Sequence, residues 1–428
     1  MKAVIMAGGK GTRIASVNSK VPKPMIPLEG KPVLQYQVEC LKRQGIQEYI
    51  FVTGYLGGQV ESYFGDGRHM GVSVSYIRED DPLGTAGALY MLQEMIDEDF
   101  LLINGDIIFD IDVNRFFKAH RCFGGMATIF VHPNSHPYDS ALVVAERNGL
   151  VREWLHKEEE RTWYQNRVNA GVHMLSPNLF TYLRKKGMLL EPRPLDLDRD
   201  ILKPLIAEKE LYAYYSTEYV KDMGTLERYE TVCRDIRLER VAQKNLSRKQ
   251  KAVFLDRDGT INRYVGFLRN VDDFELLDGT AKAIRMLNEQ GYLVVVATNQ
   301  PVIARGEVSE AELDEIHRKM ETLLGKEGAY VDAVYYCPHH PDAGFPGERK
   351  EYKIRCRCRK PEPGLLFRAA ADFHIDLTAS WMAGDSENDI LAGVAAGCHT
   401  AGLYGCAGRD GTFDNLLEFA EFLSRRQE

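Results

Sequence analysis

The amino-acid sequence predicts two consecutive α/β domains, and three observations support this fold class. Short runs of apolar residues recur in both halves of the chain, each bounded by Gly, Asp or Asn. Runs that are apolar throughout are typical of strands buried on both faces of a mostly parallel sheet. Amphipathic stretches lie between these runs, and a strongly charged stretch over 234–251 separates two copies of the pattern. Alternating strands and helices of this kind indicate α/β layers.

The expected elements follow one another in a regular order. The first half provides strands and amphipathic helices at 3–6, 33–42, 49–52, 85–95 and 100–103. The second half provides them at 252–255, 279–290, 293–296, 309–325, 381–383 and 387–396. The charged stretch contains no strand-like run, so we interpret it as a helical tail and linker. The predicted division is a first domain over 1–236, a linker over 237–250 and a second domain over 251–428.

Length and composition restrict the function. A chain of 428 residues is too long for one hydrophobic core. Its net charge of -8 argues against a nucleic-acid partner, which normally requires a basic face. No apolar run approaches the roughly 20 residues that span a bilayer, and the N-terminus lacks a leader pattern. We therefore expect a soluble cytoplasmic protein with no membrane partner.

A glycine-rich loop follows the first strand and contains Gly8, Gly9, Gly11, Thr12 and Arg13. Glycines allow backbone N–H groups to approach phosphate oxygens, and an arginine can neutralise a pyrophosphate. A simple tight turn is the alternative interpretation of such a loop. The stiff segment Pro22-Lys23-Pro24 follows and can hold Lys23 as a fixed cation.

These two segments together resemble the signature of sugar-1-phosphate nucleotidyltransferases, and the resemblance covers roughly residues 1–235. It implies a Rossmann-like domain, with Arg13 and Lys23 as catalytic cations and Gly8, Gly9, Gly11 and Thr12 as nucleotide contacts. Later landmarks follow in the family's order. The base-recognition loop contains Gly84, Thr85 and Gly87, and the first Mg²⁺ aspartate is Asp106. The lysine for the sugar phosphate is Lys157, and the sugar-binding loop contains Asn169 and Gly171. The second Mg²⁺ aspartate is Asp222.

The chemistry explains these residue types. An oxygen of a sugar phosphate attacks the α-phosphorus of a nucleoside triphosphate, so two anions must be positioned and neutralised. Mg²⁺ takes carboxylates together with substrate phosphates. An aspartate at a strand end is also a common helix cap, and Lys157 lies in a charged run typical of a solvated surface. The ordered series of landmarks favours the metal role for Asp106 and Asp222 and leaves Lys157 undecided.

The segment after Arg13 departs from the common family pattern. It reads Ile14-Ala15-Ser16, which is similar to the heptose-1-phosphate guanylyltransferase branch. The loop over 84–87 also resembles that of enzymes that use GTP. The resemblance therefore implies GTP and heptose 1-phosphate as substrates.

A second site follows the strand at 252–255. Two acids, Asp256 and Asp258, stand two residues apart, so one can attack phosphorus while the other protonates the leaving oxygen and later activates water. Mg²⁺ is needed because a carboxylate approaches a phosphate dianion only when charge is screened. The later segments Thr298-Asn299-Gln300, Arg359-Lys360 and Gly384-Asp385 complete a series that resembles the four motifs of haloacid-dehalogenase-like phosphatases.

This second resemblance implies another Rossmann-like domain. Asp256 is expected to be the nucleophile, Asp258 the acid/base, and both, with Asp385, the ligands of Mg²⁺. Thr298, Asn299 and Lys360 are expected to bind the phosphoryl group. Asp389 is interpreted either as a residue that orients the metal ligands or as a carboxylate on a helix surface.

Three cysteines and a histidine lie between the second and third motifs, at Cys337, His339, Cys356 and Cys358. A C-x-H and C-x-C arrangement suits a closed tetrahedral Zn²⁺ site with a structural role. Packed free cysteines are the alternative. The family pattern selects His339 and leaves His340 to orient or contact substrate.

The segment Cys-Pro-His-His-Pro, followed by Cys-x-Cys-Arg-Lys-Pro, is similar to that of the D-glycero-D-manno-heptose-1,7-bisphosphate phosphatases, with histidinol-phosphate phosphatases as near relatives. Residues 303–306 favour the heptose enzymes, and the resemblance implies that Arg305 and Arg359 contact substrate. One departure is Pro301-Val302, where a small pair is usual. Because proline lacks an N–H donor, this predicts a slower phosphatase or one with an altered preference.

The two sites together imply consecutive reactions. Heptose 1,7-bisphosphate would lose its 7-phosphate, and GTP would then convert heptose 1-phosphate into GDP-heptose and pyrophosphate. One alternative is a mannose-1-phosphate nucleotidyltransferase fused to a histidinol-phosphate-like phosphatase. Another is that one half is inactive and serves in assembly or regulation. The oligomeric state, including a homo-oligomer, stays open.

Overall fold

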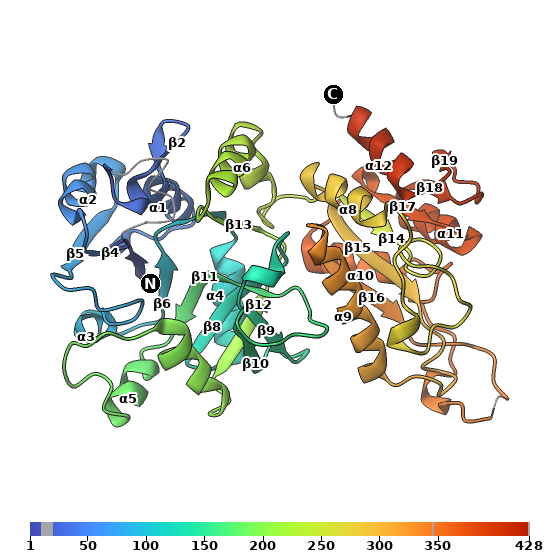
Figure 1. Cartoon of the computed structure of the whole chain (residues 1–428), viewed down its shortest axis with the longest axis horizontal. Helices are drawn as coiled ribbons and strands as arrows, with labels where there is room; N and C mark the ends of the chain where they lie inside the picture. The colour runs from blue at the N-terminus through green and yellow to red at the C-terminus, as the bar shows by residue number, and fades with distance from the viewer. Residues whose placement is uncertain (10–19, 345, 427–428) are drawn as a thin grey trace. The chain divides into compact units, whose positions relative to one another are not determined.

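The computed structural model describes residues 1–9, 20–344 and 346–426 (Figure 1). Within these ranges no helix has both the length and the apolar character needed to cross a membrane. The chain forms two compact α/β units, which confirms the predicted fold class. The first unit comprises Met1–His132, Val143–Leu155 and Asn169–Asn245. The second comprises Pro133–Leu142, His156–Val168 and Leu246–Glu428.

A nine-stranded sheet is the centre of the first unit, and its main path runs β10-β9-β11-β6-β1-β4-β5; off this path, β8 pairs with β11 and β12 pairs with β8. The bounds are β1 Ala3–Met6, β4 Glu48–Thr53, β5 Ser73–Arg78, β6 Phe100–Asn104, β8 Ala127–His132, β9 Leu142–Ala145, β10 Val151–Leu155, β11 Val168–Leu175 and β12 Leu211–Tyr215. The middle strand β1 pairs in parallel with β4 and β6, and Met6 stands opposite Val52 and Asn104. The carboxyl ends of these apolar strands therefore meet at one edge of the sheet.

Helices and two short strand pairs complete the first unit. Their bounds are α1 Val33–Arg43, α2 Gly57–Phe64, α3 Leu89–Leu92, α4 Val113–Phe123, α5 Asn178–Lys185, α6 Leu226–Arg237, α7 Arg240–Gln243, β2 Pro27–Leu28, β3 Lys31–Pro32, β7 Ile107–Asp110 and β13 Tyr219–Asp222. One helix predicted over 85–95 is shorter than expected. Residues before α3 form turns instead, because the Gly87 N–H bonds to Leu83 O and the Ala86 N–H bonds to Leu195 O.

The second unit contains a six-stranded parallel sheet in the order β16-β15-β14-β17-β18-β19. Its strands are β14 Ala252–Leu255, β15 Leu293–Asn299, β16 Ala333–Cys337, β17 Trp381–Gly384, β18 His399–Leu403 and β19 Gly411–Phe413. Its helices are α8 Thr280–Glu289, α9 Glu310–Lys326, α10 Gly364–Phe373, α11 Glu387–Ala396 and α12 Leu416–Arg425. A buried core cluster joins α8, α9 and α12 to the central strands.

Strand order places the second site. From β14 the chain proceeds to β15 on one side and later returns to β17 on the other. Ligands of open α/β sheets bind outside the carboxyl ends of strands at such a switch point. Residues that follow β14, β15 and β17 are therefore brought to one place, as the motif series predicts.

Candidate active sites

The first site begins where β1 ends. Ala7 continues the sheet by donating its N–H to Val52 O at 2.7 Å, and the chain then reaches Gly8 and Gly9. A Cβ added to Gly8 would meet the backbone N of Gly54 at 3.4 Å, so the two loops pack closely. The predicted Gly11, Thr12 and Arg13 lie outside the described residues. Only the start of the predicted phosphate cradle is therefore placed.

Lys23 and Asp106 form an ion pair in the structure. Lys23 opens the 3-10 turn Lys23–Met25, with Pro22 in the preceding position, so its backbone is held stiffly. Asp106 follows β6, and the Gly105 N–H donates to Met6 O at 3.0 Å. The carboxylate expected to bind metal thus carries a lysine counter-charge next to the glycine loop.

The second predicted metal aspartate comes from a distant part of the sequence. Strand β13 pairs antiparallel with β7 and sets Asp222 opposite Ile107, the residue after Asp106. The N–H of Met223 also donates to the carbonyl of Asp106, at 3.3 Å. The structure therefore brings Asp106 and Asp222 together. Two oxygen-donor side chains of this kind fit Mg²⁺, which completes its shell with water and substrate phosphates.

Arg228 is a residue of this site that sequence reasoning missed. Its Nη1 lies 3.0 Å from each carboxylate oxygen of Asp222, whose Oδ1 also accepts the Gly224 N–H at 2.7 Å. The residue stands in the first turn of α6, which Thr225 caps by accepting the Arg228 N–H. The sequence signal that could have identified Arg228 is an arginine in the first turn of the helix that follows the Asp222 loop.

The predicted base and sugar loops are each held by contacts with another segment of the chain. Gly84 forms a bridge with Leu195, and Thr85 Oγ1 accepts the Leu197 N–H at 2.7 Å. In the sugar loop, Gly171 has φ of +72°, and a Cβ there would lie 2.5 Å from Asn104 Nδ2. Only glycine permits that approach, which fixes the sugar loop against the strand that leads to the first metal aspartate.

Asn169 of the sugar loop has a partner that the sequence did not indicate. Its Nδ2 donates to Asp198 Oδ1 at 3.4 Å, and burial raises the pKa of Asp198 to about 6. Lys157 is not brought into this group: it is exposed, and the segment His156–Val168 belongs to the second unit. Its predicted contact with the sugar phosphate stays a prediction.

The second site centres on a buried lysine. Lys360 is 3% exposed, and its Nζ lies 2.8 Å from Asp256 Oδ1 and 2.5 Å from Asp389 Oδ1. Asn299 at the end of β15 fixes the Lys360 backbone by two hydrogen bonds of 3.0 Å, one donated in each direction. Motif residues from separate strand ends thus meet around Asp256.

The charge balance of this group favours a bound cation. Burial raises the pKa of Asp256 to about 7 although Lys360 opposes the shift, and burial also raises the pKa of Asp385. Asp256, Asp385 and Asp389 each offer an oxygen, and these oxygens lie within 4.8 Å of one another. The donors fit Mg²⁺. Asp389 is buried and bonded to Lys360, so it is not a carboxylate on a solvated helix surface.

Two residues of the loop after β14, Gly259 and Thr260, lie against Asp385 and hold it in place. Thr260 Oγ1 donates to Asp385 Oδ1 at 3.0 Å. Gly259 has φ of +88°, and a Cβ there would lie 2.2 Å from Asp385 Oδ2.

The Asp258 side chain lies outside the carboxylate group around Asp256, because its oxygens bond to Arg257 and to two side-chain amides. The structure therefore does not gather Asp258 with the other predicted Mg²⁺ ligands.

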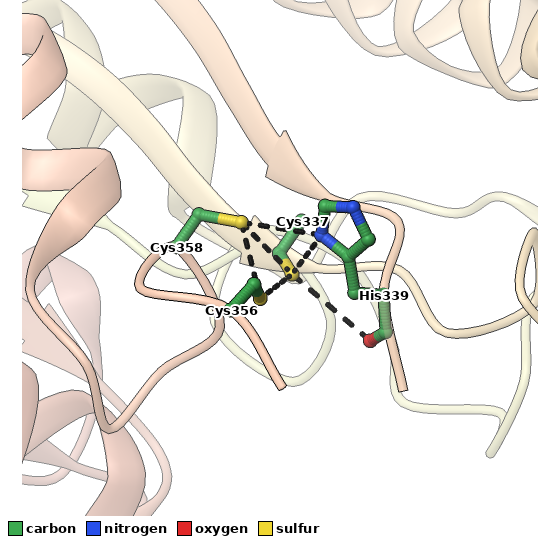
Figure 2. Close-up of side chains that lie close together, drawn as sticks. All are labelled: Cys337, His339, Cys356 and Cys358. Carbon is green, nitrogen blue, oxygen red and sulfur yellow. Dashed lines mark hydrogen bonds between the residues drawn. The ribbon is translucent and has the colours of Figure 1, made fainter. Parts of the chain in front are cut away.

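The four predicted zinc ligands converge at the end of β16 (Figure 2). The sulfur atoms of Cys337, Cys356 and Cys358 lie 3.3 to 3.5 Å apart, and His339 Nδ1 lies 3.6 Å from Cys337 Sγ and 3.4 Å from Cys358 Sγ. Donors around tetrahedral Zn²⁺ with bonds of about 2.3 Å stand about 3.8 Å apart, so the cluster fits zinc.

Two further observations support this cluster as a metal site. The hydrogen bond between Cys337 and Cys358 lowers the pKa of Cys358 to about 5 and raises the pKa of Cys337, so Cys358 is the thiol of this pair that loses its proton more readily. His340 is turned elsewhere, since its Nδ1 accepts the Asp342 N–H at 3.2 Å. His339, which the family pattern selects, is therefore the histidine of the cluster.

The predicted substrate arginines are held by neighbouring groups. Arg305 stacks with its guanidinium carbon 4.0 Å from the Phe267 ring centroid, and Arg359 Nη1 donates to His339 O at 3.3 Å. Within the departure at Pro301-Val302, the valine has a packing reason. Val302 is 1% exposed and belongs to a small apolar cluster with Ile303, Val308 and Leu313.

Comparisons with known proteins match different families to two parts of the chain. A family model described as nucleotidyl transferase matches residues 2–239, and one described as HAD-hydrolase-like matches residues 357–405. The D-glycero-beta-D-manno-heptose-1,7-bisphosphate 7-phosphatase of Escherichia coli (strain K12) is 43% identical over 155 residues, which are 36% of this chain and 79% of that protein.

Two solved structures are each similar to part of this chain. HddC from Yersinia pseudotuberculosis, complexed with GMP-PN, is 25% identical and covers 55% of this chain and 99% of its own, with a TM-score of 0.46. The D,D-heptose 1.7-bisphosphate phosphatase from B. bronchiseptica, complexed with magnesium and phosphate, is 33% identical and covers 41% of this chain and 99% of its own, with a TM-score of 0.37.

Proposed function

We propose that this chain is an enzyme of nucleotide-activated heptose synthesis. Over residues 2–239 the chain belongs to the nucleotidyl transferase family. Its second half belongs to the haloacid-dehalogenase-like family, as its 7-phosphatase relatives do. Its phosphatase site removes the 7-phosphate of D-glycero-D-manno-heptose 1,7-bisphosphate. Its transferase site then transfers GMP from GTP to heptose 1-phosphate. The observation that carries the proposal is that one chain holds both sites. Consecutive reactions explain this arrangement, because the product of the first reaction is the acceptor for the second.

In the proposed phosphatase reaction an oxygen of Asp256 attacks phosphorus, and the bond to the sugar oxygen breaks. Asp258 gives its proton to that oxygen, and phosphate stays on Asp256 as an acyl phosphate. Water then attacks phosphorus, Asp258 takes its proton, and inorganic phosphate leaves. Lys360, already bonded to Asp256, balances the negative charge, with Thr298 and Asn299 beside it. Mg²⁺ held by Asp256 and Asp385 would screen the phosphate dianion.

In the proposed transferase reaction an oxygen of heptose 1-phosphate attacks the α-phosphorus of GTP, and pyrophosphate departs. The chain contributes positioning and charge compensation. Lys23 and Arg13 neutralise the triphosphate, Gly84, Thr85 and Gly87 contact the base, and Asn169 and Gly171 hold the sugar. Mg²⁺ held by Asp106 and Asp222 would stabilise the charge of the departing pyrophosphate.

We also propose boundaries for the two functional parts. The transferase comprises 1–236, the phosphatase comprises 251–428, and 237–250 connects them. A structural Zn²⁺ bound by the Cys337 cluster, defined here as Cys337, His339, Cys356 and Cys358, fixes the loop that precedes Arg359 and Lys360.

A product assay tests the proposal. Purified protein is incubated with Mg²⁺, heptose 1,7-bisphosphate and each of the four common nucleoside triphosphates in turn, and products are identified by mass. We expect release of one phosphate in every reaction and GDP-heptose only with GTP. GDP-mannose formed from mannose 1-phosphate, together with release of phosphate from histidinol phosphate, would favour the alternative substrates. Absence of one activity would indicate that one half serves in assembly or regulation.

A further inference from the structure

A buried arginine, Arg257, lies between the two acids of the phosphatase site in the sequence. Arg257 is 0% exposed, although an arginine in this position of the sequence has no predicted role. Its Nη2 donates to Asp258 Oδ1 at 3.0 Å and to Oδ2 at 2.8 Å, and its Nε donates to Oδ1 at 3.2 Å. A planar guanidinium that holds both oxygens of a carboxylate fixes the direction of that group.

Two amides complete the surroundings of Asp258. Asn262 Nδ2 donates to Oδ1 at 3.0 Å, and Gln300 Nε2 donates to Oδ2 at 2.8 Å. The same Gln300 amide donates to Thr298 Oγ1 at 3.0 Å, and Gln300 Oε1 accepts from Arg257 Nη2 at 3.0 Å. The carboxylate is therefore closely held on both of its oxygens.

The arginine itself is anchored from α9. His317 Nε2 lies 3.1 Å from Arg257 Nη1, and His317 is 4% exposed. Burial and the neighbouring Arg257 lower the pKa of His317 to about 3, so the ring is neutral and Nε2 accepts a hydrogen bond. The neighbours Ile316 and Met320 pack in the core, and a capping box at Ser309 fixes the start of the helix. The position of the acceptor is thus set by a packed helix.

We propose that His317 and Arg257 are positioning residues that aim Asp258 at the sugar oxygen and at the attacking water. The inference rests on the proposed role of Asp258 as acid and base. Without the imidazole acceptor, Nη1 of a fully buried arginine would lose its partner, and the guanidinium would turn to regain one. Because Asp258 is held by that guanidinium, its carboxyl group would turn as well.

Leaving-group dependence tests this inference. Phenyl phosphate and p-nitrophenyl phosphate differ in the basicity of the leaving oxygen, so only phenyl phosphate depends strongly on an aimed acid. For His317→Leu we expect kcat/KM to fall about tenfold with phenyl phosphate and less than about threefold with p-nitrophenyl phosphate, because a misdirected acid loses only part of the roughly 10²–10⁴-fold that general acid catalysis supplies. KM should change little with phenyl phosphate, whose first step stays rate-limiting, and should fall with p-nitrophenyl phosphate. A burst of p-nitrophenol should appear, because misdirected Asp258 slows hydrolysis of the acyl phosphate.

Two variants serve as matched comparisons. His317→Gln supplies an amide oxygen as acceptor and should recover most of the loss with phenyl phosphate. Asp258→Asn removes the acid itself and should show a larger loss with the same dependence on the leaving group. Zinc content and thermal unfolding, compared with the parent protein, report whether the fold is kept.

Each outcome decides the matter. Equal losses with both esters, or no loss in His317→Leu, would overturn the positioning role. If Asp258→Asn shows no dependence on the leaving group, the proposed acid role of Asp258 fails, independently of His317. If His317→Leu does not fold, Arg257→Lys keeps the charge and loses the planar contact. It must then show the same selective loss with phenyl phosphate, and equal losses would refute the inference.

Discussion

At the residue scale, Lys360 balances two buried carboxylates, those of Asp256 and Asp389. We predict that Lys360→Met lowers the free energy of unfolding of the second unit by about 3–5 kcal/mol, because breaking a buried ion pair leaves charge uncompensated in the interior. Urea denaturation in the absence of added metal measures the change. Lys249→Met is the control: its pair with Asp376 is exposed, so its loss should stay below about 1 kcal/mol. Equal losses in the two variants would contradict the prediction.

His173 provides a second residue-scale prediction. It is 1% exposed in β11, and its Nδ1 lies 3.2 Å from Leu102 O, while Nε2 has no hydrogen-bond partner among the described residues. Burial lowers its pKa to about 4, below the unfolded value of about 6.5. The neutral, buried His173 therefore contributes to the free energy of unfolding above about pH 6.5. This contribution, about 3 kcal/mol in total, is lost as pH falls through about 4.

The substitution His173→Leu removes this proton uptake. We expect the free energy of unfolding of the first unit to depend less on pH between 6.5 and 4 in the variant than in the parent protein. Urea denaturation at several pH values in that interval measures both slopes. Identical slopes would show that His173 does not contribute to the acid sensitivity.

At the element scale, the Cys337 cluster joins the end of β16 to the segment that precedes α10. We predict that Cys356→Ser abolishes zinc binding and lowers the melting temperature of the second unit, since the loop between the ligands loses its closure. Metal analysis and calorimetry measure the two effects. Cys406→Ser changes a thiol outside the cluster and should keep both values. Zinc retained by Cys356→Ser would exclude the proposed ligand set.

Elements also show how much the sequence could predict. Asp256, Thr298 and Asp385 follow or end apolar strands, and parallel strands present their carboxyl ends at one edge, so their convergence could be predicted. The zinc ligands could be predicted as well, because their spacing is characteristic. Helix α3 could not be bounded, because long-range hydrogen bonds to Leu195 hold the preceding residues in turns.

Pairings between distant segments account for what the sequence did not reveal. Asp106 meets Asp222 through the β7–β13 ribbon, whose short strands carry no local signal of their partner. His317 reaches Arg257 from the interior face of α9, where a buried histidine has the same helical spacing as a core residue. The metal-site aspartates were recognised by motif, whereas their neighbours Arg228 and His317 required the tertiary structure.

At the scale of the whole molecule, Asp256 and Asp106 belong to different compact units. A change of charge at one site should therefore leave the other site intact. We predict that Asp256→Asn abolishes release of phosphate but keeps formation of pyrophosphate from GTP and heptose 1-phosphate. Asp106→Ala should do the reverse. Separate assays for phosphate and pyrophosphate measure both activities, and loss of both activities in either variant would contradict two independent sites.

Mixing the two variants extends this test to the reaction sequence. Neither variant alone should convert heptose 1,7-bisphosphate and GTP into GDP-heptose, because each lacks one step. An equimolar mixture should form the product, since heptose 1-phosphate released by Asp106→Ala can diffuse to the transferase site of Asp256→Asn. The lag before product appears should shorten as protein concentration rises, because the intermediate then accumulates faster. Failure of the mixture, with each single step active, would instead indicate that the intermediate must pass between sites of the same molecule.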